Sequence, residues 1–266
     1  MEWRVEEDPD GLRDETRERT AAGETADIID WVRRRLEFEP DEAQKRVLTT
    51  GSKRVALNCT RQWGKSTITA AKAVHHAYTT AGSLALVVSP SLRQSGEFLR
   101  KATEFARRLK IRAKGDGRNE ISLEFPNHAR IVGLPGNEAT VRGFSAVSLL
   151  IVDEAARVDD ELYMAIRPMM AVSQGSLWLI STPNGKMGFF YETWMRGGPE
   201  WERVRVPADE CPRIPPEFLK EELATMGERR FRREYMCEFT DSEGAVFDMD
   251  LVERAFTTDV EPLELR

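Results

Sequence analysis

Apolar runs that alternate with helical segments constrain the fold of this chain more than any other feature. Strand-like runs recur along the sequence, and the last is the weakest: RVALNC, SLALVVSP, VSLLIVDEA, GSLWLISTPNG and WERVRVP. Segments with helical spacing stand between them, for example KSTITAAKAVHHAYTT and SLRQSGEFLRKATEFARRLK. Strands that are apolar throughout are typical of a parallel sheet buried on both faces. The sequence therefore predicts an α/β fold with a mostly parallel central sheet flanked by helices.

Other segments complete the predicted architecture. EISLEFPNHARIVGLPG alternates apolar and polar residues about Pro126-Asn127, which predicts an antiparallel hairpin. Helices are expected over residues 25–38, capped by Thr25 or Asp27, and from Pro40 to Leu48, capped by Asp41. Residues 215–239 also have helical spacing. We expect a charged N-terminal arm over 1–24, one domain over 25–240, and a linker or tail over 241–266.

Bulk composition excludes several classes of protein. The formal net charge is -6 and the pI about 5.4, so any nucleic-acid binding has to rest on local basic patches. Three cysteines without metal-ligand spacing are typical of a reducing compartment. The acidic, polar start is not a secretory signal, and no apolar run approaches the roughly 20 residues of a membrane span. These features predict a cytoplasmic globular protein.

The segment CTRQWGKSTITAA ends like a phosphate-binding loop of the form G-x-x-x-x-G-K-S/T, although Cys59 replaces the first glycine. Gly64 would let the backbone approach phosphates, and Lys65 would reach the β and γ phosphates. Ser66 would offer its hydroxyl to Mg²⁺, and Thr67 would cap the helix beside the α-phosphate. The alternative is a chance G-K-S sequence at a helix start.

A second motif strengthens the interpretation as a nucleotide site. The run LLIVDEA ends in Asp153 and Glu154. An aspartate at such a strand end holds Mg²⁺ in P-loop ATPases, and the next glutamate is placed to activate water. Acids at a helix N-terminus are also favoured without any catalytic role. The two motifs in this order, each at a strand end, predict an ATP-hydrolysing site.

Two further segments extend the candidate site. Ser181 and Thr182, in STPNG, follow the fourth apolar run and could sense the γ-phosphate and couple it to movement. The alternative is an ordinary turn, because Pro-Asn-Gly strongly favours one. Gln44 precedes the first strand, and its amide could donate to and accept from an adenine edge. An exposed helical glutamine is otherwise often inert.

With these residues in view, the chain resembles the ATPase domain of tailed-bacteriophage terminase large subunits over about residues 25 to 250. The matching segments are PDEAQKRVL, RQWGKST, TVRGFSAVSLLIVDEA, WLISTPNGKMGFFYETW and RREYMCEF. The resemblance implies a P-loop NTPase fold of the ASCE type. In that family, RQ before GKS is a usual form of the loop, so the loss of the first glycine is expected.

The resemblance also implies roles for individual residues. Arg61 would contact the γ-phosphate from within the same subunit, and Gln62 and Trp63 would belong to the ATP-binding loop. Gln44 would belong to an adenine-recognising motif, and Ser181 and Thr182 to a coupling motif. Arg142, in TVRGF, matches a position expected for an arginine finger that reaches a neighbour's ATP in a ring. A purely structural arginine before the second motif is the alternative.

The resemblance further implies an ATPase that uses ATP and Mg²⁺ to translocate viral double-stranded DNA into a procapsid. Its expected partners are DNA, the portal protein and the small terminase subunit, in a homo-oligomeric ring in the cytoplasm of an infected bacterial host, with no membrane. Such subunits continue into a nuclease domain, and none is recognisable here, so no DNA cleavage is expected from this chain. Lys114 and Arg118 are the best candidates for DNA contact, although most basic residues nearby are expected to form a solvated helix face.

Three other interpretations fit parts of the sequence. A superfamily 2 helicase shares both motifs but needs a second motor domain. A non-catalytic ATP-sensing assembly module would bind nucleotide without turnover, which the intact pair of Lys65 and Glu154 disfavours. A small-molecule kinase has less support, because a glutamate directly after Asp153 suits the activation of water.

Overall fold

The computed structural model of the chain describes residues 28–111, 114–119, 121–136, 143–241 and 255–256. Within them a seven-stranded sheet has the order β3-β4-β2-β5-β6-β1-β7. The strands are β1 (Arg54–Cys59), β2 (Leu84–Ser89), β3 (Ser122–Glu124), β4 (Arg130–Pro135), β5 (Leu149–Asp153), β6 (Ser176–Ser181) and β7 (Trp201–Val206). All neighbouring strands pair in parallel except β3 and β4. The predicted α/β fold with a mostly parallel sheet is confirmed.

The antiparallel pair is the predicted hairpin. Phe125 and Ala129 close its turn through a backbone hydrogen bond of 2.9 Å, so Pro126-Asn127 lies inside the turn as expected. β6 lies between β1 and β5, so the strand before the phosphate loop and the strand that ends in Asp153 are separated by one strand. This arrangement agrees with the fold that the resemblance implies.

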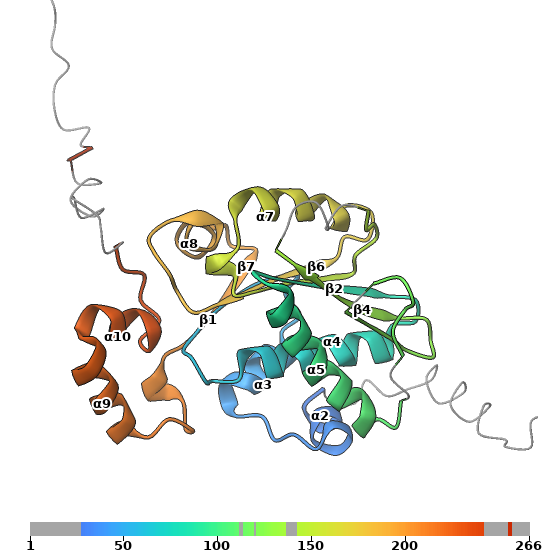
Figure 1. Cartoon of the computed structure of the whole chain (residues 1–266), viewed down its shortest axis with the longest axis horizontal. Helices are drawn as coiled ribbons and strands as arrows, with labels where there is room; N and C mark the ends of the chain where they lie inside the picture. Colours follow the sequence, from blue (N-terminus) through green and yellow to red (C-terminus); the bar gives the residue numbers. More distant parts are fainter. Residues whose placement is uncertain (1–27, 112–113, 120, 137–142, 242–254, 257–266) are drawn as a thin grey trace, which may run out of the picture.

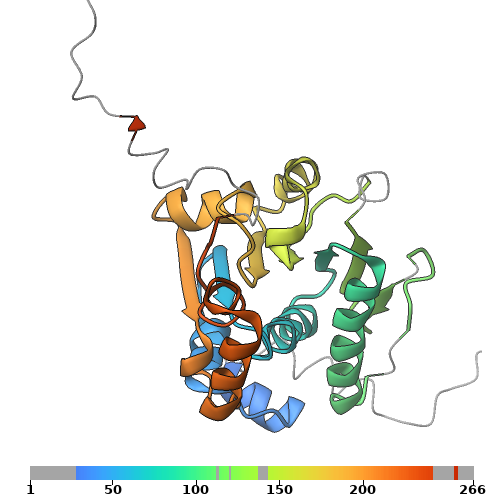
Figure 2. The same cartoon turned by 60° about the vertical axis from the view of Figure 1, so that its left-hand side comes forward.

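Helices cover both faces of the sheet (Figure 1). Below the sheet in that view lie α2 (Ile28–Leu36), α3 (Glu42–Thr49), α4 (Lys65–Thr79) and α5 (Leu92–Arg108), and above it α7 (Asp160–Ile166) and α8 (Gly188–Arg196). α9 (Pro216–Met226) and α10 (Glu228–Glu234) stand to one side and come forward in Figure 2. The sequence indicated one helical stretch over 215–239, but Gly227, with φ of 78°, separates α9 from α10. Short 3-10 segments complete the fold: η1 (Ala155–Arg157), η2 (Arg167–Met170) and η3 (Ala208–Glu210).

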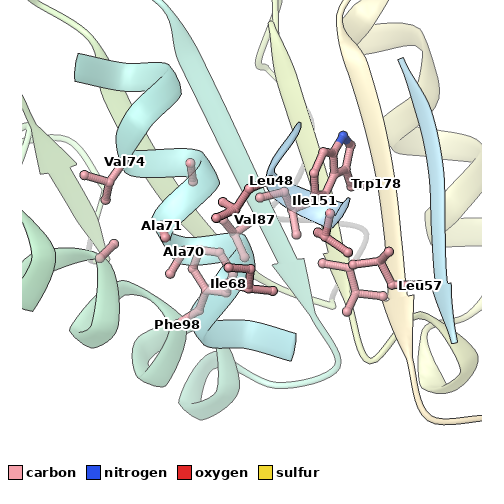
Figure 3. Close-up of a cluster of buried hydrophobic side chains, with 14 of the residues drawn as sticks. Leu48, Leu57, Ile68, Ala70, Ala71, Val74, Val87, Phe98, Ile151 and Trp178 are labelled. Carbon is pink, nitrogen blue, oxygen red and sulfur yellow. The ribbon is translucent and has the colours of Figure 1, made fainter. Parts of the chain in front are cut away.

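The alternation of side chains along each strand divides the core into two layers. In β5, Leu149 and Ile151 belong to the core layer between the sheet and helices α4 and α5, whereas Leu150 and Val152 belong to the layer between the sheet and helices α7 and α8. Figure 3 shows the first layer, where Ile68 and neighbouring α4 residues pack towards side chains of the sheet. Burial on both faces explains why the strands are apolar throughout.

The predicted helix cap at Asp41 is confirmed. Its side chain accepts a hydrogen bond from the Gln44 backbone, and the Gln44 side chain accepts one from the Asp41 backbone. Thr25 and Asp27, the arm over 1–24 and most of the tail over 241–266 lie outside the described residues, and the limits of the predicted domain stay a prediction. None of the helices in the described part of the chain is long and apolar enough to cross a membrane.

Candidate nucleotide-binding site

The predicted phosphate, metal and coupling residues lie at the carboxyl ends of β1, β5 and β6, which meet at one edge of the sheet because the three strands are parallel. The loop before Lys65 follows β1, Asp153 ends β5, and Ser181 ends β6. The fold therefore brings together the segments that the sequence marked separately.

The phosphate loop reaches α4 through left-handed backbone. Gln62 and Gly64 have φ of 63° and 93°, and Gly64 is the N-cap of α4. The prediction that Thr67 caps this helix was wrong. Thr67 lies inside the first turn, where its backbone N–H donates to the Gly64 carbonyl over 2.9 Å. Gly64 takes the cap because a left-handed turn favours glycine, and the turn leaves the first α4 amides facing the loop.

Trp63 and Gln44 brace the loop from inside the protein. Trp63 is fully buried, so its ring packs in the core and does not face the open side of the loop. Gln44 is also buried, and its Nε2 donates to the Trp63 carbonyl over 3.2 Å while its Oε1 accepts from the Asp41 N–H over 3.0 Å. Arg213 donates to the same Trp63 carbonyl. The adenine-reading role of Gln44 stays a prediction, and the structure adds a bracing role to it.

Lys65 is the centre of the site. Its Nζ lies 2.9 Å from Oε1 of Glu154 and donates to Oγ1 of Thr182 over 3.3 Å. Lys65 is buried and the Glu154 side chain is 20% exposed, so this charge pair is poorly screened by water. One lysine thus joins the phosphate loop, the end of β5 and the end of β6.

Ser66 and Asp153 meet beside this pair. The Ser66 hydroxyl donates to Oδ2 of Asp153 over 3.2 Å. Burial, and after it the neighbouring charge of Glu154, raise the pKa of the Asp153 carboxyl to about 6, against the opposing effect of Lys65. No cluster of three or more His, Cys, Asp or Glu side chains suited to a metal occurs among the described residues. A hydroxyl and one carboxylate nevertheless fit Mg²⁺, which usually completes its shell with phosphate and water.

Glu154 has a strained backbone and a second partner that sequence reasoning missed. Its φ and ψ of 53° and 43° are left-handed, a conformation that costs about 1–3 kcal/mol in a non-glycine residue and is found mostly at functional sites. Nη1 of Arg157 donates to Oε2 of Glu154 over 3.0 Å. No motif marked Arg157, although its spacing of three residues from Glu154 could have suggested the pairing.

Ser181 connects the end of β6 to the turn after Glu154. The Ser181 hydroxyl accepts a hydrogen bond from the Ala156 N–H over 3.1 Å and donates to the Thr182 carbonyl over 2.7 Å. Because Thr182 accepts a hydrogen bond from Lys65, the STP segment contacts both the residue that follows the phosphate loop and the turn after Glu154. These contacts suit the predicted coupling role, which stays a prediction.

Arg61 points to a residue that sequence reasoning did not select. Its Nε donates to Oε2 of Glu234 over 2.5 Å. Glu234 ends α10 and its side chain is only 7% exposed. The two residues are 173 positions apart, and the RREYMCEF segment that contains Glu234 gave no indication of this contact.

Arg142 lies outside the described residues, so its predicted role stays a prediction. Lys114 and Arg118 are exposed in a loop beside β3, at the edge of the sheet opposite β7. Asp116 organises this loop by accepting hydrogen bonds from the backbones of Arg118 and Asn119 and from the side chain of Ser122. The loop thus presents two cations on an ordered turn.

Comparison with known proteins agrees with this geometry. Residues 57–254 match the family model described as "Terminase large subunit, T4likevirus-type, N-terminal". The chain belongs to this family. The terminase large subunits of Thermus virus P23-45 and Thermus phage G20c are each 25% identical to it, over 248 and 251 residues. Each alignment covers 80% of this chain and 51% of the relative, so the chain spans about half the length of these relatives.

Solved terminase structures share the fold. The ATPase domain of the Thermus phage P74-26 large terminase superposes with a TM-score of 0.71 at 23% identity, covering 79% of this chain and 98% of that one. The large terminase of phage HK97 gives a TM-score of 0.66 at 16% identity, over 80% and 55% of the two chains. That of phage D6E in complex with ADP gives 0.64 at 13% identity, over 79% and 56%. The resemblance stated from the sequence is therefore confirmed at the level of family and fold.

Proposed function

We propose that this terminase domain hydrolyses ATP and that hydrolysis drives translocation of viral double-stranded DNA into a procapsid. The observation that carries the proposal is the contact of Lys65 with both Glu154 and Thr182, next to the contact of Ser66 with Asp153. A cation for phosphate, a hydroxyl and carboxylate for a metal, and a glutamate for water are the parts that phosphoryl transfer to water requires.

Each residue then has a definite task. The loop amides and Lys65 bind the phosphates, and Ser66 and Asp153 would hold Mg²⁺, which neutralises charge on the transferred group. Glu154 orients the attacking water and accepts its proton. Gln44 and the loop residues Arg61, Gln62, Trp63, Gly64 and Thr67 complete the ATP site, with the buried Trp63 holding the loop on the core.

The glutamate variant tests hydrolysis directly. Glu154→Gln keeps the size of the side chain but removes the proton acceptor, so steady-state phosphate release is expected to fall by at least about a hundredfold. Binding of a fluorescent ATP analogue should persist. Glu161→Gln, at an exposed position of α7, is the control and should behave as wild type. Normal turnover in Glu154→Gln would overturn the assignment.

Motor action needs partners, and we propose those of the family: duplex DNA, the portal protein and the small terminase subunit, in a ring that works in the cytoplasm of an infected bacterium. Lys114 and Arg118 are proposed DNA contacts through phosphate, which should make binding weaken steeply with salt. Changing both to alanine should weaken DNA binding and reduce its salt dependence in a filter-binding titration. If DNA affinity depended on salt concentration as steeply as in wild type, the DNA contact would have to lie on other residues.

Arg142 is proposed as the arginine that reaches a neighbouring subunit's ATP. Arg142→Ala is then expected to lose turnover while keeping ATP affinity. The ATPase rate per subunit of the wild-type chain should rise with protein concentration, with or without duplex DNA. A specific rate that is independent of concentration would argue against a contribution in trans.

A further inference from the structure

An open pocket, here called the basic pocket, lies at the edge of the sheet opposite the candidate nucleotide site. It has a volume of about 660 Å³, which is within the range of ligand-binding sites. It lies where β1 and β6 begin, beside the end of α7 and the following η2, and these parallel strands end at the other edge, near Lys65. Its lining residues include three cations, two methionines and a glutamine: Lys53, Arg54, Arg167, Met164, Met170 and Gln174.

Two of the cations are held in place by the backbone before β6. Nζ of Lys53 donates to the Gln174 carbonyl over 3.1 Å, and Nη1 of Arg54 donates to the Gly175 carbonyl over 2.9 Å. These bonds occupy carbonyl groups and not carboxylates, so they leave the positive charges in place. The two cations are therefore positioned without being neutralised.

Arg167 brings a third charge to the same place. Its guanidinium lies over the Tyr163 ring, 5.7 Å from the ring centre. Burial raises the pKa of Tyr163, and the charges of Arg167 and Arg54 oppose that rise, so both guanidiniums lie near this one side chain. Within the described part of the chain, no carboxylate lines the basic pocket. In a chain with a net charge of -6, this is a local concentration of positive charge.

Apolar side chains accompany these charges. Met164 and Met170 both line the basic pocket, and Met164 is 63% exposed whereas Met170 is buried. Val172, next to the lining residue Ala171, is 83% exposed, so the apolar surface continues beyond the pocket. Methionine adapts to surfaces of varied shape, and exposed apolar groups bordered by charges are typical of interaction sites.

We infer that the basic pocket docks an acidic segment of a partner protein, whose carboxylates meet the cations while an apolar side chain contacts the methionines. Charge complementarity selects this occupant, because guanidinium groups pair closely with carboxylates. An extended segment would also cover Val172, which a small anion inside the pocket would leave exposed. Phosphates of DNA supply charge but no apolar group for Met164 and Met170. The inference goes beyond the proposed ATPase and does not depend on it.

The experiment is fluorescence anisotropy of the full 266-residue chain with a fluorescein-labelled peptide in which glutamate alternates with leucine. Arg167→Glu should weaken binding at least about tenfold, because repulsion replaces attraction. Arg167→Lys keeps the charge and should stay within about threefold of wild type. Met164→Asp should weaken binding at least about fivefold, because it removes an apolar contact and adds a like charge.

Two matched controls place the same changes elsewhere. Arg107→Glu alters an exposed arginine of α5, which lies on the opposite face of the sheet from α7 (Figure 1). Met187→Asp alters a methionine that is 68% exposed at the start of α8. Both should bind the peptide as wild type does. Arg167→Glu and Met164→Asp should keep the wild-type ATPase rate, because the basic pocket and the nucleotide site lie at different edges of the sheet.

Several results would overturn the inference. Wild-type protein that does not bind the peptide, or Arg167→Glu that binds it equally well, removes the docking site. A peptide with serine in place of leucine should bind at least about fivefold more weakly, and equal binding would make the pocket a site for anions alone. A greater loss of duplex DNA binding than of peptide binding in Arg167→Glu would assign the pocket to nucleic acid.

Folding and catalysis are judged separately. If Arg167→Glu does not fold, as circular dichroism would report, Met164→Asp decides, and unchanged peptide binding in that variant overturns the inference. Absence of ATPase activity in the wild-type chain would remove the proposed function and leave the docking site intact. Loss of peptide binding with normal turnover in both pocket variants is the result expected.

Discussion

Replacing Gln44 by methionine is expected to destabilise the domain, because Gln44 connects the start of α3 to the phosphate loop. Methionine has a similar length but forms neither the bond to the Asp41 N–H nor the bond to the Trp63 carbonyl. Each neutral hydrogen bond contributes about 1 kcal/mol, so the free energy of unfolding should fall by about 2 kcal/mol. For a domain of this size the corresponding shift in Tm is about 4–8 °C.

Thermal and urea unfolding followed by circular dichroism measure this loss. Gln94→Met is a matched control, since Gln94 also follows a helix cap, Ser91, by three positions but makes its side-chain contact at an exposed site. The control should change stability by less than about 0.5 kcal/mol. An equal, small effect of both variants would refute the bracing role. A change in preference for ATP over GTP in Gln44→Met would separately test the adenine-reading role.

Three more predictions follow from the described contacts. Gly64→Ala should destabilise the domain by about 1–2 kcal/mol in urea unfolding and weaken ATP binding, because alanine is strained at φ of 93° and its Cβ would lie 3.3 Å from Nε2 of Gln44; wild-type stability would contradict this. Partial burial acts to raise the pKa of Asp116, but the hydrogen bonds from Asn119 and Arg118 outweigh it and lower the pKa below its ordinary value of 3.8. Ionised Asp116 therefore stabilises the folded protein above pH 3.8, and this contribution is lost as the pH falls towards the lowered pKa of the folded state. The free energy of unfolding should consequently fall less steeply with acid in Asp116→Asn than in wild type. Parallel curves for the two proteins would contradict the prediction. Burial raises the pKa of Cys59 well above its ordinary value and that of Cys237 to about 12. Cys59, Cys211 and Cys237 are all buried, so a thiol reagent at about pH 8 should label them only after denaturation. Labelling of the folded protein would contradict their burial.

Much of the site was predictable because its signals are local. The apolar runs before Cys59 and through Asp153 identified buried strands, and parallel pairing then placed their ends at one edge of the sheet. The Asp41 cap consists of its contacts with Gln44, only three positions away. Short-range patterns of this kind leave few alternatives.

The remainder depends on contacts that no local pattern contains. Glu234 meets Arg61 across 173 positions, and a sequence pattern does not reveal which acid of RREYMCEF faces the loop. The cap of α4 was placed wrongly because threonine is a common cap, whereas the left-handed turn after Trp63 assigns it to Gly64. The burial of Trp63 likewise follows from the packing of the loop on the core, not from its motif.

The contact between the carboxyl end of α10 and the start of the phosphate loop also determines when the site can be completed during synthesis. Asn58 and Cys237, whose side chain and carbonyl meet there, are 179 positions apart. A chain emerging from the ribosome makes the loop first and its support much later, and contacts of such long range form slowly. The loop therefore acquires its full set of contacts only after Cys237 has left the ribosome, long after the strand that precedes the loop has been made.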